Sequence, residues 1–593
     1  MKKIFLVIVT LLTSVLLNAA DVNPGKNTFK SNLPIVLLDT KLPLTNTEKR
    51  EAHMRVIYSE GKKQYSSSDS DYQYDGSVAI KLRGNSSLGF SQKKYTFELR
   101  DSADKDIDVS LMGMPAHSDW VLLAPYSDVS MIRDVFAFQL WRDMGYWAPR
   151  TCLCEVVVNG EYAGVYALSE AIKRDKNRVN IDKMKKTDIS GRELTGGYLL
   201  RIDTFDDDDA TFRSHVPGIG DGLFMTDITW TCLYPKKKKL QPEQMEYISN
   251  FIGDMERTFA SDSYTDPTHG YAAYIDISSF VDYFIHTELS LNADAYKRSA
   301  YFYKDRQNAD GTGGLLHAGP AWDYNLAYGC CSFCNADDIN AWAFEGCNTN
   351  PTPLFWKRLY QDPAFMARVR TRYTELRKTT LSTRHLFALI DGYARQLQTA
   401  QERHFSRYPE LLGSETKRSP AGSGMMAGMG GMVQGGGRGQ MPGGAFPQFD
   451  IGFPAMGGFP AMGQMNDSIM RVMMEQGRKM FEQMRNYKLD SDTATATPRG
   501  VGFPGMGGFP PFGAMPGMGG FPPFGAMPGT GGMSGGNVAF PQMGGGEGMA
   551  GMGGAMLSWF RSYTVKSYAD EIKMLKDWLK DRLEVLDEKI LRN

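Results

Sequence analysis

Four polar side chains in the middle of the chain have the types and spacing of a divalent-cation site. Asp323 and Asn325 stand two residues apart, and Asn292 and Asp294 form a second pair with the same spacing upstream. Positions i and i+2 of an extended chain point the same way, so the oxygens of Asp323 and Asn325 can face one cation. Oxygen-rich ligand sets suit Mg²⁺ or Mn²⁺. The alternative is a turn whose aspartate bonds its own backbone.

A second stretch, between strand-like runs at 78–82 and 93–99, has the composition of a phosphate-binding turn. Its basic and polar members are Arg83, Asn85, Ser86, Lys93 and Lys94. A strand, a glycine-containing loop and a second strand can place backbone N–H groups over phosphates with a lysine beneath. An ordinary hairpin turn is the alternative interpretation.

Length and composition set outer limits on the protein class. The chain has 593 residues, 42% of them hydrophobic, and a net charge of −1. This composition supports a large core and does not favour nucleic acid or an anionic membrane as a partner. The lysine run 236–239 and the acidic run 206–209 are most simply solvated surface, with calcium binding an alternative for the acidic run.

The first twenty residues have the pattern of a secretory signal peptide. Lys2 and Lys3 precede an uncharged apolar run, and Asn18-Ala19-Ala20 ends it with small residues. The run is too short for a confident membrane span, and no later run is long enough. We expect residues 1–20 to be removed and the protein to be secreted, periplasmic or attached to the cell surface, without a stable membrane span.

Four of the seven cysteines cluster directly after Asp323, namely Cys330, Cys331, Cys334 and Cys347. In an oxidising compartment we expect one or two local disulfides. A four-thiolate zinc site is the alternative, although adjacent Cys330 and Cys331 match paired zinc knuckles poorly.

Alternating apolar residues predict a β-rich N-terminal half, and helical periodicity predicts a helical C-terminal half. The expected strands are 33–38, 53–58, 78–82, 93–99, 120–124, 154–158 and 162–168. The last two flank Asn159-Gly160, a strong signal for a two-residue hairpin turn. The expected helices are 131–144, with Asp128 or Ser130 as its cap, 241–258, 355–360, 363–378 and 382–407.

Residues 418–556 are mostly Gly, Met, Pro and Phe, a composition that cannot pack a core, so we expect disorder. A short helix is predicted at 466–487, and the methionines leave copper binding as an alternative to a flexible linker. Apolar residues recur at helical spacing from Ile572 to Ile590, so the chain should end in an amphipathic helix that needs a partner. The low-complexity segment is therefore predicted to be an insertion into one domain.

Several motifs taken together resemble the CotH kinase family, named for spore-coat protein H. They are Arg83-Gly84-Asn85-Ser86-Ser87 with Lys93, Leu122 to Asp128 with Met131-Ile132-Arg133, Asn159 to Tyr166 with Glu170, Asn292-Ala293-Asp294, Trp322 to Asn325 with Gly329, and Trp578 to Arg582. The resemblance covers residues 33–593 apart from the low-complexity insertion. It implies a domain formed by 33–417 and completed by 557–593.

The resemblance implies an α+β, atypical protein-kinase-like fold, with a β-rich N-terminal lobe and a helical C-terminal lobe interrupted by the insertion. It implies transfer of phosphate from ATP, with Mg²⁺ or Mn²⁺, to hydroxyls of envelope or secreted proteins. Lys93 corresponds to the lysine on the ATP phosphates, with Lys94 as the alternative, and Asp294 to the catalytic base. Asp323 corresponds to the metal-holding aspartate. The remaining residues assigned to the ATP and metal site are Arg83, Asn85, Ser86, Glu170, Asn292 and Asn325.

Three positions depart from the family pattern. Asn325 stands where many members have a second aspartate, Ser299 where a kinase catalytic loop has asparagine, and Arg201 where an acid is expected. These departures support an alternative, in which the chain is a catalytically weak kinase-like scaffold that acts as a surface binding or assembly protein. The sequence gives no indication of the oligomeric state.

Overall fold

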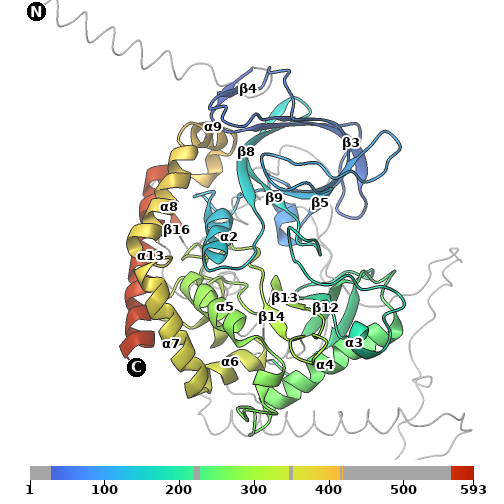
Figure 1. The fold of residues 1–593 in the computed structure, drawn as a ribbon. Helices are drawn as coiled ribbons and strands as arrows, with labels where there is room; N and C mark the ends of the chain where they lie inside the picture. Colours follow the sequence, from blue (N-terminus) through green and yellow to red (C-terminus); the bar gives the residue numbers. More distant parts are fainter. Residues whose placement is uncertain (1–27, 219–227, 346–350, 414–416, 419–562, 593) are drawn as a thin grey trace, which may run out of the picture. The chain divides into compact units, whose positions relative to one another are not determined.

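The computed structural model describes residues 28–218, 228–345, 351–413, 417–418 and 563–592 (Figure 1). The chain divides into a unit formed by 1–434 with 544–593, and a second unit, 435–543. All described residues belong to the first unit. The predicted signal peptide, the predicted helix at 466–487 and almost all of the predicted insertion lie outside the described residues.

Seven strands of the N-terminal half close into a barrel (Figure 1). In barrel order they are β2 (Ile35–Thr40), β3 (Arg50–Ile57), β5 (Tyr74–Arg83), β6 (Lys94–Arg100), β7 (Asp119–Leu123), β9 (Glu161–Glu170) and β8 (Thr151–Val158). All neighbours are antiparallel except β2 and β8, whose parallel pairing closes the barrel. Alternate residues such as Ile80, Phe97 and Trp120 are fully buried, as expected when one face of each strand fills a barrel interior.

The predicted strands of this half are all present, with bounds that differ by a few residues. The Asn159-Gly160 hairpin joins β8 to β9, and both turn residues have positive φ, as a two-residue hairpin turn requires. A short pair, β1 (Lys30–Ser31) and β4 (Tyr65–Ser66), lies outside the barrel.

The C-terminal half contains a sheet that the predicted helical half did not include. Five antiparallel strands lie in the order β11 (Ala210–Arg213), β12 (Thr229–Tyr234), β10 (Tyr198–Ile202), β13 (Ala300–Lys304) and β14 (Leu316–Ala318). The helices are α3 (Gly191–Leu194), α4 (Pro242–Ala260), α5 (Ile277–Ser290), α6 (Leu354–Gln361), α7 (Pro363–Lys378), α8 (Thr383–Gln396) and α9 (Ala400–Arg407). The single helix predicted at 382–407 is therefore two helices. Single-turn helices lie at Ser86–Gly89, Tyr271–Ala273, Phe333–Asn335, Ala343–Glu345 and Pro409–Leu411.

Helix α5 is the most buried helix of the described chain and was not predicted. Every residue from Ser279 to Ser290 is buried, including the polar residues Asp282, His286 and Glu288, so polar and apolar residues do not separate into an exposed and a buried face. The Asp276 carboxylate caps its start by accepting a hydrogen bond of 2.8 Å from the Ser279 backbone N–H. The helix ends at Leu291, whose left-handed backbone turns the chain toward Asp294.

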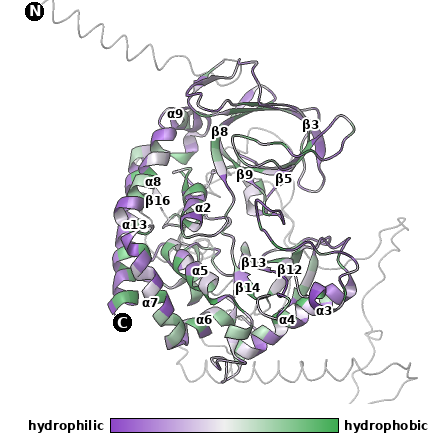
Figure 2. Ribbon diagram, viewed as in Figure 1, coloured by the Kyte–Doolittle hydropathy of each residue, from purple (hydrophilic) through white to green (hydrophobic). Residues whose placement is uncertain are grey.

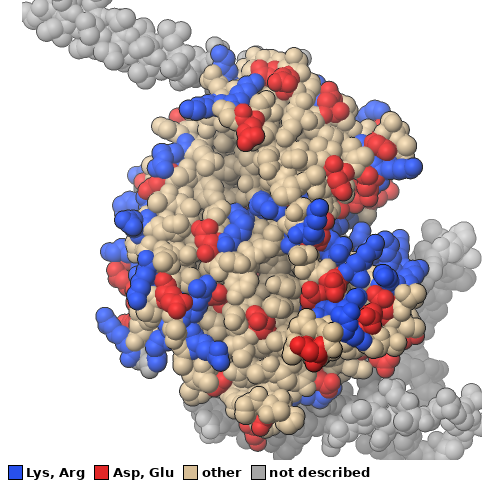
Figure 3. All heavy atoms as spheres, viewed as in Figure 1, with Lys and Arg blue, Asp and Glu red and all other residues tan. Residues whose placement is uncertain are grey.

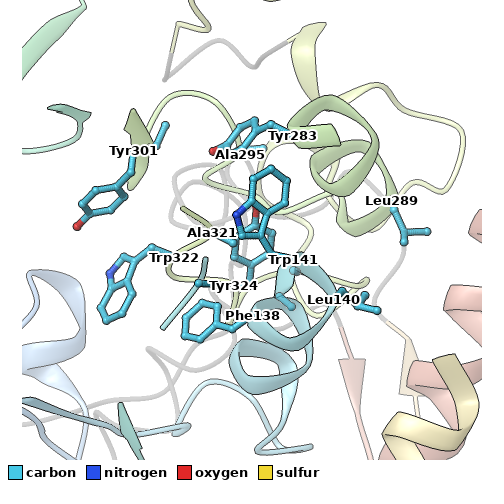
Figure 4. Close-up of a cluster of buried hydrophobic side chains, with 14 of the residues drawn as sticks. Phe138, Leu140, Trp141, Tyr283, Leu289, Ala295, Tyr301, Ala321, Trp322 and Tyr324 are labelled. Carbon is cyan, nitrogen blue, oxygen red and sulfur yellow. The ribbon is translucent and has the colours of Figure 1, made fainter. Parts of the chain in front are cut away.

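Helix α2 (Arg133–Asp143) packs between the barrel and the C-terminal half. Its aromatic residues join those that flank Asp323, as Figure 4 shows for Phe138, Trp141, Trp322 and Tyr324. The Phe138 and Trp322 rings stack with centroids 5.6 Å apart. The N-cap position of this helix is Ile132, so the prediction of Asp128 or Ser130 as its cap is wrong, although the Asp128 carboxylate does accept a hydrogen bond of 2.8 Å from the Arg133 backbone N–H in the first turn.

The last helix, α13 (Tyr568–Leu586), continues as a short π-helix, Asp587–Arg592. It lies beside α7 and α8 (Figure 1), and Figure 2 shows hydrophobic and hydrophilic residues mixed along all three helices, as expected for helices with one buried face. Before α13, strand β16 (Tyr563–Thr564) pairs with β15 (Lys417–Arg418). The two ends of the predicted insertion therefore meet in the structure.

Five of the cysteines, Cys152, Cys154, Cys232, Cys330 and Cys331, are not part of a disulfide. The described residues also contain no group of three or more His, Cys, Asp or Glu side chains that could hold a metal ion, so Cys330 and Cys331 form no zinc site among them. Cys334 is not a free thiol, and Cys347 lies outside the described residues, so a disulfide in this cluster stays a prediction for that part. Within the described part of the chain, no helix has the length and apolarity of a membrane span.

Two buried histidines predict that acid destabilises the fold. His404 of α9 accepts a hydrogen bond of 3.1 Å from the Val165 backbone N–H through Nδ1, and burial lowers its pKa to about 3. Burial also lowers the pKa of His286 in α5 to about 4. A histidine of the unfolded chain has a pKa of about 6.5, so below that pH the unfolded chain binds a proton that the folded chain does not. The free energy of unfolding should therefore fall by about 1.4 kcal/mol per pH unit for each of the two histidines as the pH falls toward the folded pKa.

Denaturant unfolding at pH 7.5 and 5.5 measures this loss. His404→Gln should reduce the difference in unfolding free energy between the two pH values, whereas His269→Gln, at an exposed histidine, should not. An unchanged difference in His404→Gln would show that this ring is not the acid-sensitive group.

Candidate active site

Lys94 and Asp323 meet where the barrel faces the C-terminal half. Lys94, the first residue of β6, places Nζ 3.4 Å from Asp323 Oδ1, and the two side chains are 11% and 31% exposed. Lys93 points the other way and donates a hydrogen bond of 2.7 Å to the Leu88 carbonyl. Leu88 belongs to the turn formed by residues 83–89, called the glycine turn below. Consecutive residues of an extended chain alternate in direction, so only one of the two lysines can face Asp323. Of the two predicted lysines, the structure brings Lys94 to Asp323.

The chain around Asp323 is not extended, because Asp323 has a left-handed backbone with φ 64°. The alternation on which the shared cation of Asp323 and Asn325 was predicted is therefore absent, and the shared cation stays a prediction. The Asn325 side-chain amide donates a hydrogen bond of 2.7 Å to Ser127 Oγ. A non-glycine residue in this conformation is strained, and such residues cluster at functional sites.

Asp294 lies close to Asp323 in the loop after α5. Burial and, second to it, the negative charge of Asp323 together raise the pKa of Asp294 to about 6. Asn292 links the two segments, since its side-chain amide donates a hydrogen bond of 3.0 Å to the Asp323 backbone carbonyl. Its Oδ1 lies 3.4 Å from the Asp294 backbone N–H. In this geometry Asn292 holds the two carboxylates near each other.

Asp134, in the first turn of α2, belongs to the same group and was missed by the sequence analysis. Its Oδ1 accepts a hydrogen bond of 2.6 Å from the Tyr324 backbone N–H. Burial raises the pKa of Asp134 to about 7, the Lys94 ammonium opposes the rise, and the Asp323 carboxylate adds to it. The available signal was its position directly after the Met131-Ile132-Arg133 motif, at the start of a predicted helix.

Asp203, just after β10, is the second missed acid. Ser299 Oγ lies 3.3 Å from Asp203 Oδ2 and 3.4 Å from Asp323 Oδ2, so one hydroxyl joins both carboxylates. Burial raises the pKa of Asp203, and Arg201 opposes the rise. Arg201, which stands where an acid was expected, pairs with Asp209 at 3.1 Å and lies 3.8 Å from Asp203. The acid of this strand thus lies two residues after the expected position, on the same side of the chain.

The glycine turn lies over this group of residues. The Arg83 guanidinium stacks on the Trp322 ring, 5.0 Å from its centroid, and Asn85 donates a hydrogen bond of 2.6 Å to Thr204 Oγ1. Gly84 has φ 104°, and a Cβ there would lie 1.9 Å from Ser87 Oγ, so only glycine fits this turn. Ser86 is exposed within the turn. The turn is therefore tied to the segments that carry Asp203 and Asp323.

Glu170, also predicted to contact the cofactor, is held by arginines. It is fully buried and accepts hydrogen bonds from Arg150 at 2.9 Å and 3.0 Å, and Arg178 lies 3.8 Å away. Among the described residues, none of the hydrogen bonds or ion pairs of Glu170 is with Lys94 or with any of the four acids Asp134, Asp203, Asp294 and Asp323. This arrangement makes Glu170 a structural residue at the end of β9.

The site has an oxygen-rich donor set but not a complete metal cage. Within the described residues, no group of three or more His, Cys, Asp or Glu side chains has the geometry to hold a metal ion. Two carboxylates, Asp203 and Asp323, do converge on one point at Ser299. Mg²⁺ is commonly held by one or two carboxylates, with waters and substrate phosphates completing its shell, so this pair fits such an ion. Figure 3 shows charges of both signs interspersed over the face in view, so no large patch of one sign covers that face.

Comparison with known proteins adds to this geometry. The family model described as CotH kinase protein matches residues 80–422, more than half of the 593-residue chain. The chain belongs to the CotH kinase family. The matched range contains Lys93 and Lys94, the three acids of the C-terminal half and Asp134. No curated protein matches the sequence.

Proposed function

We propose that this CotH kinase family member transfers phosphate from ATP to side-chain hydroxyls of proteins. The observation that carries the proposal is the meeting of Lys94 from the barrel with Asp323 from the C-terminal half, beside the buried carboxyl of Asp294. Phosphoryl transfer depends on positioning and on charge stabilisation, for which a lysine, a metal-holding acid and a proton-accepting acid suffice. The barrel and the C-terminal half would act as the two lobes of a kinase-like fold.

Each residue has a separate task in this proposal. Lys94, rather than Lys93, binds the ATP phosphates, because only Lys94 faces Asp323. The glycine turn covers the phosphates with backbone N–H groups. Asp294 accepts the proton of the acceptor hydroxyl, a task that suits a carboxyl whose pKa of about 6 lies near neutral pH. Asp134 holds the Lys94 ammonium in place from α2.

Asp323 and Asp203 would hold a divalent ion together with the phosphate oxygens, and Ser299 would orient their carboxylates. A bound Mg²⁺ or Mn²⁺ supplies positive charge that offsets the charge of the phosphate oxygens. The proposed set uses two carboxylates and does not depend on Asn325, whose side-chain NH2 group donates a hydrogen bond to Ser127 Oγ.

The signal-like N-terminus supports an exported enzyme, and its substrates would be envelope or secreted proteins. These are proposals that rest on residues 1–20 and on the implications of family membership.

Labelled ATP tests the proposal directly. The purified chain from residue 21 onward is incubated with labelled ATP and either Mg²⁺ or Mn²⁺, with chelator as the control. We expect metal-dependent label on the protein, and mass spectrometry would locate the acceptor hydroxyls. Absence of both label and metal-dependent nucleotide binding by calorimetry, in a folded sample, would overturn the proposal in favour of a binding scaffold.

A further inference from the structure

The C-terminal helix α13 contacts, through three separate side chains, the segments that carry three of the four acids of the site, namely Asp134, Asp294 and Asp323. These side chains are Glu571, Trp578 and Arg582, all buried. The first of them, Glu571, lies 248 positions beyond Asp323 in the sequence.

Glu571 contacts the base of α2. It is fully buried, and its Oε1 accepts hydrogen bonds from Arg133 at 2.6 Å and from the Tyr563 hydroxyl at 2.7 Å. Arg133 also donates a hydrogen bond of 2.8 Å to the Tyr563 hydroxyl and one of 2.9 Å to the Ala327 carbonyl. Arg133 directly precedes Asp134, so this network fixes the turn of α2 from which the Asp134 carboxylate accepts the hydrogen bond of the Tyr324 backbone N–H, next to Asp323.

Trp578 contacts the segment after Asp323. A Cβ on Gly329 would lie 2.4 Å from the Trp578 ring, so the indole packs directly on that glycine. The Tyr328 ring meets Trp578 edge to face, with centroids 6.3 Å apart. The Tyr328 backbone N–H donates a hydrogen bond of 2.7 Å to the Ser290 carbonyl at the end of α5. Trp578 thus holds the loop that begins with the strained backbone of Asp323.

Arg582 contacts the segment before Asp294. Its guanidinium donates hydrogen bonds of 3.0 Å and 2.6 Å to the Glu288 carbonyl, and it lies 3.6 Å from the Glu288 carboxylate. That carboxylate accepts a hydrogen bond of 3.0 Å from the hydroxyl of Tyr296, two residues after Asp294. Both charged side chains are fully buried.

We propose that α13 is the alignment element of the active site and that Glu571 is a positioning residue for the pair formed by Asp323 and Lys94. It acts through Arg133 and Asp134, whose carboxylate accepts a hydrogen bond from the Tyr324 backbone N–H next to Asp323. A helix needed only to cover the core would be served by apolar side chains. Buried charges repay their desolvation only where their geometry is well satisfied, so two buried ion pairs on one helix indicate a demand for position. The proposal rests on the proposed function for its catalytic meaning, but the alignment itself can be measured without catalysis.

The reactivity of the Lys94 amino group reports the alignment. Limited acetylation of the full chain by acetic anhydride, quantified by mass spectrometry, compares Lys94 with Lys580 on the exposed side of α13 and with fully buried Lys304. In Glu571→Gln we expect Lys94 labelling to rise at least about threefold relative to Lys580, while Lys304 stays protected. Asp577→Asn, at an exposed position of the same helix, is the matched control and should match the native protein.

A second variant and a nucleotide titration complete the test. If Glu571→Gln fails to fold, Tyr563→Phe removes a single hydroxyl from the same network and should raise Lys94 labelling in the same direction. In the native protein, calorimetry with Mg-ADP tests the proposed function separately. Given binding there, Glu571→Gln should weaken it about tenfold. Lys94 labelling that stays at the native level in a folded Glu571→Gln or Tyr563→Phe variant would overturn the alignment role, even if transfer were lost.

Discussion

Replacing Asp323 with asparagine is expected to lower the rate of phosphoryl transfer by at least about 10³-fold while leaving the protein folded. The substitution removes the carboxylate that lies beside Lys94 and that shares Ser299 with Asp203. Its negative charge also raises the pKa values of Asp134 and Asp294, so its removal relieves repulsion among buried acids. The stability of the variant should therefore equal or exceed that of the native protein.

Transfer of label from ATP and thermal unfolding, measured on the same samples, check both parts. Asp310→Asn, at an aspartate in an exposed turn, is the control that changes the same functional group away from the site. Transfer by Asp323→Asn within tenfold of the native rate would remove Asp323 from the machinery. A marked fall in its melting temperature would contradict the repulsion argument.

The adjacent lysines Lys93 and Lys94, at the start of β6, provide the second prediction, because they differ by one position and point in opposite directions. Lys94→Met should weaken Mg-ADP binding by about 10- to 100-fold, since it removes the only positive charge from β6 that faces Asp323 among the described residues. Lys93→Met removes only a hydrogen bond to the Leu88 carbonyl and should cost about 1 kcal/mol of stability. Calorimetric titration and denaturant unfolding of both variants separate the two effects.

Loss of nucleotide binding in Lys93→Met, with binding retained in Lys94→Met, would show that Lys93 is the lysine that contacts the phosphates. Equal losses in both variants would indicate that the glycine turn, which Lys93 supports from below, contributes as much to binding as the charge of Lys94.

Strands and amphipathic helices could be predicted from the sequence because each has a local period. The barrel hairpin at Asn159-Gly160 and the final helix are examples, and both are present. Barrel closure depends on the pairing of β2 with β8, which lie more than one hundred residues apart, and has no local signal. Helix α5 was not predicted because its polar residues, such as Asp282 and His286, are buried along with the apolar ones, so the polar and apolar residues do not mark an exposed and a buried face.

The residue types of the candidate site could be predicted from the sequence better than the directions in which their side chains point. Asp294, Asn292 and Asp323 do lie together. The choice between Lys93 and Lys94 depended on the strand register, which shifts by one residue without any change in composition. The left-handed backbone of Asp323, which breaks the alternation between Asp323 and Asn325, has no local signal in the sequence. Asp134 and Asp203 were missed because each becomes part of the site only through folding.

The ribosome makes α13 last, so the rest of the site is synthesised before the helix that aligns it. Synthesis at about 5–20 residues per second puts roughly 7–30 s between the appearance of Arg418 and that of Tyr563. During this interval Arg133 lacks Glu571, Gly329 lacks the indole of Trp578, and Glu288 lacks Arg582. A nascent or prematurely ended chain therefore carries every acid of the site without the helix that aligns them, and only the completed protein has the full arrangement.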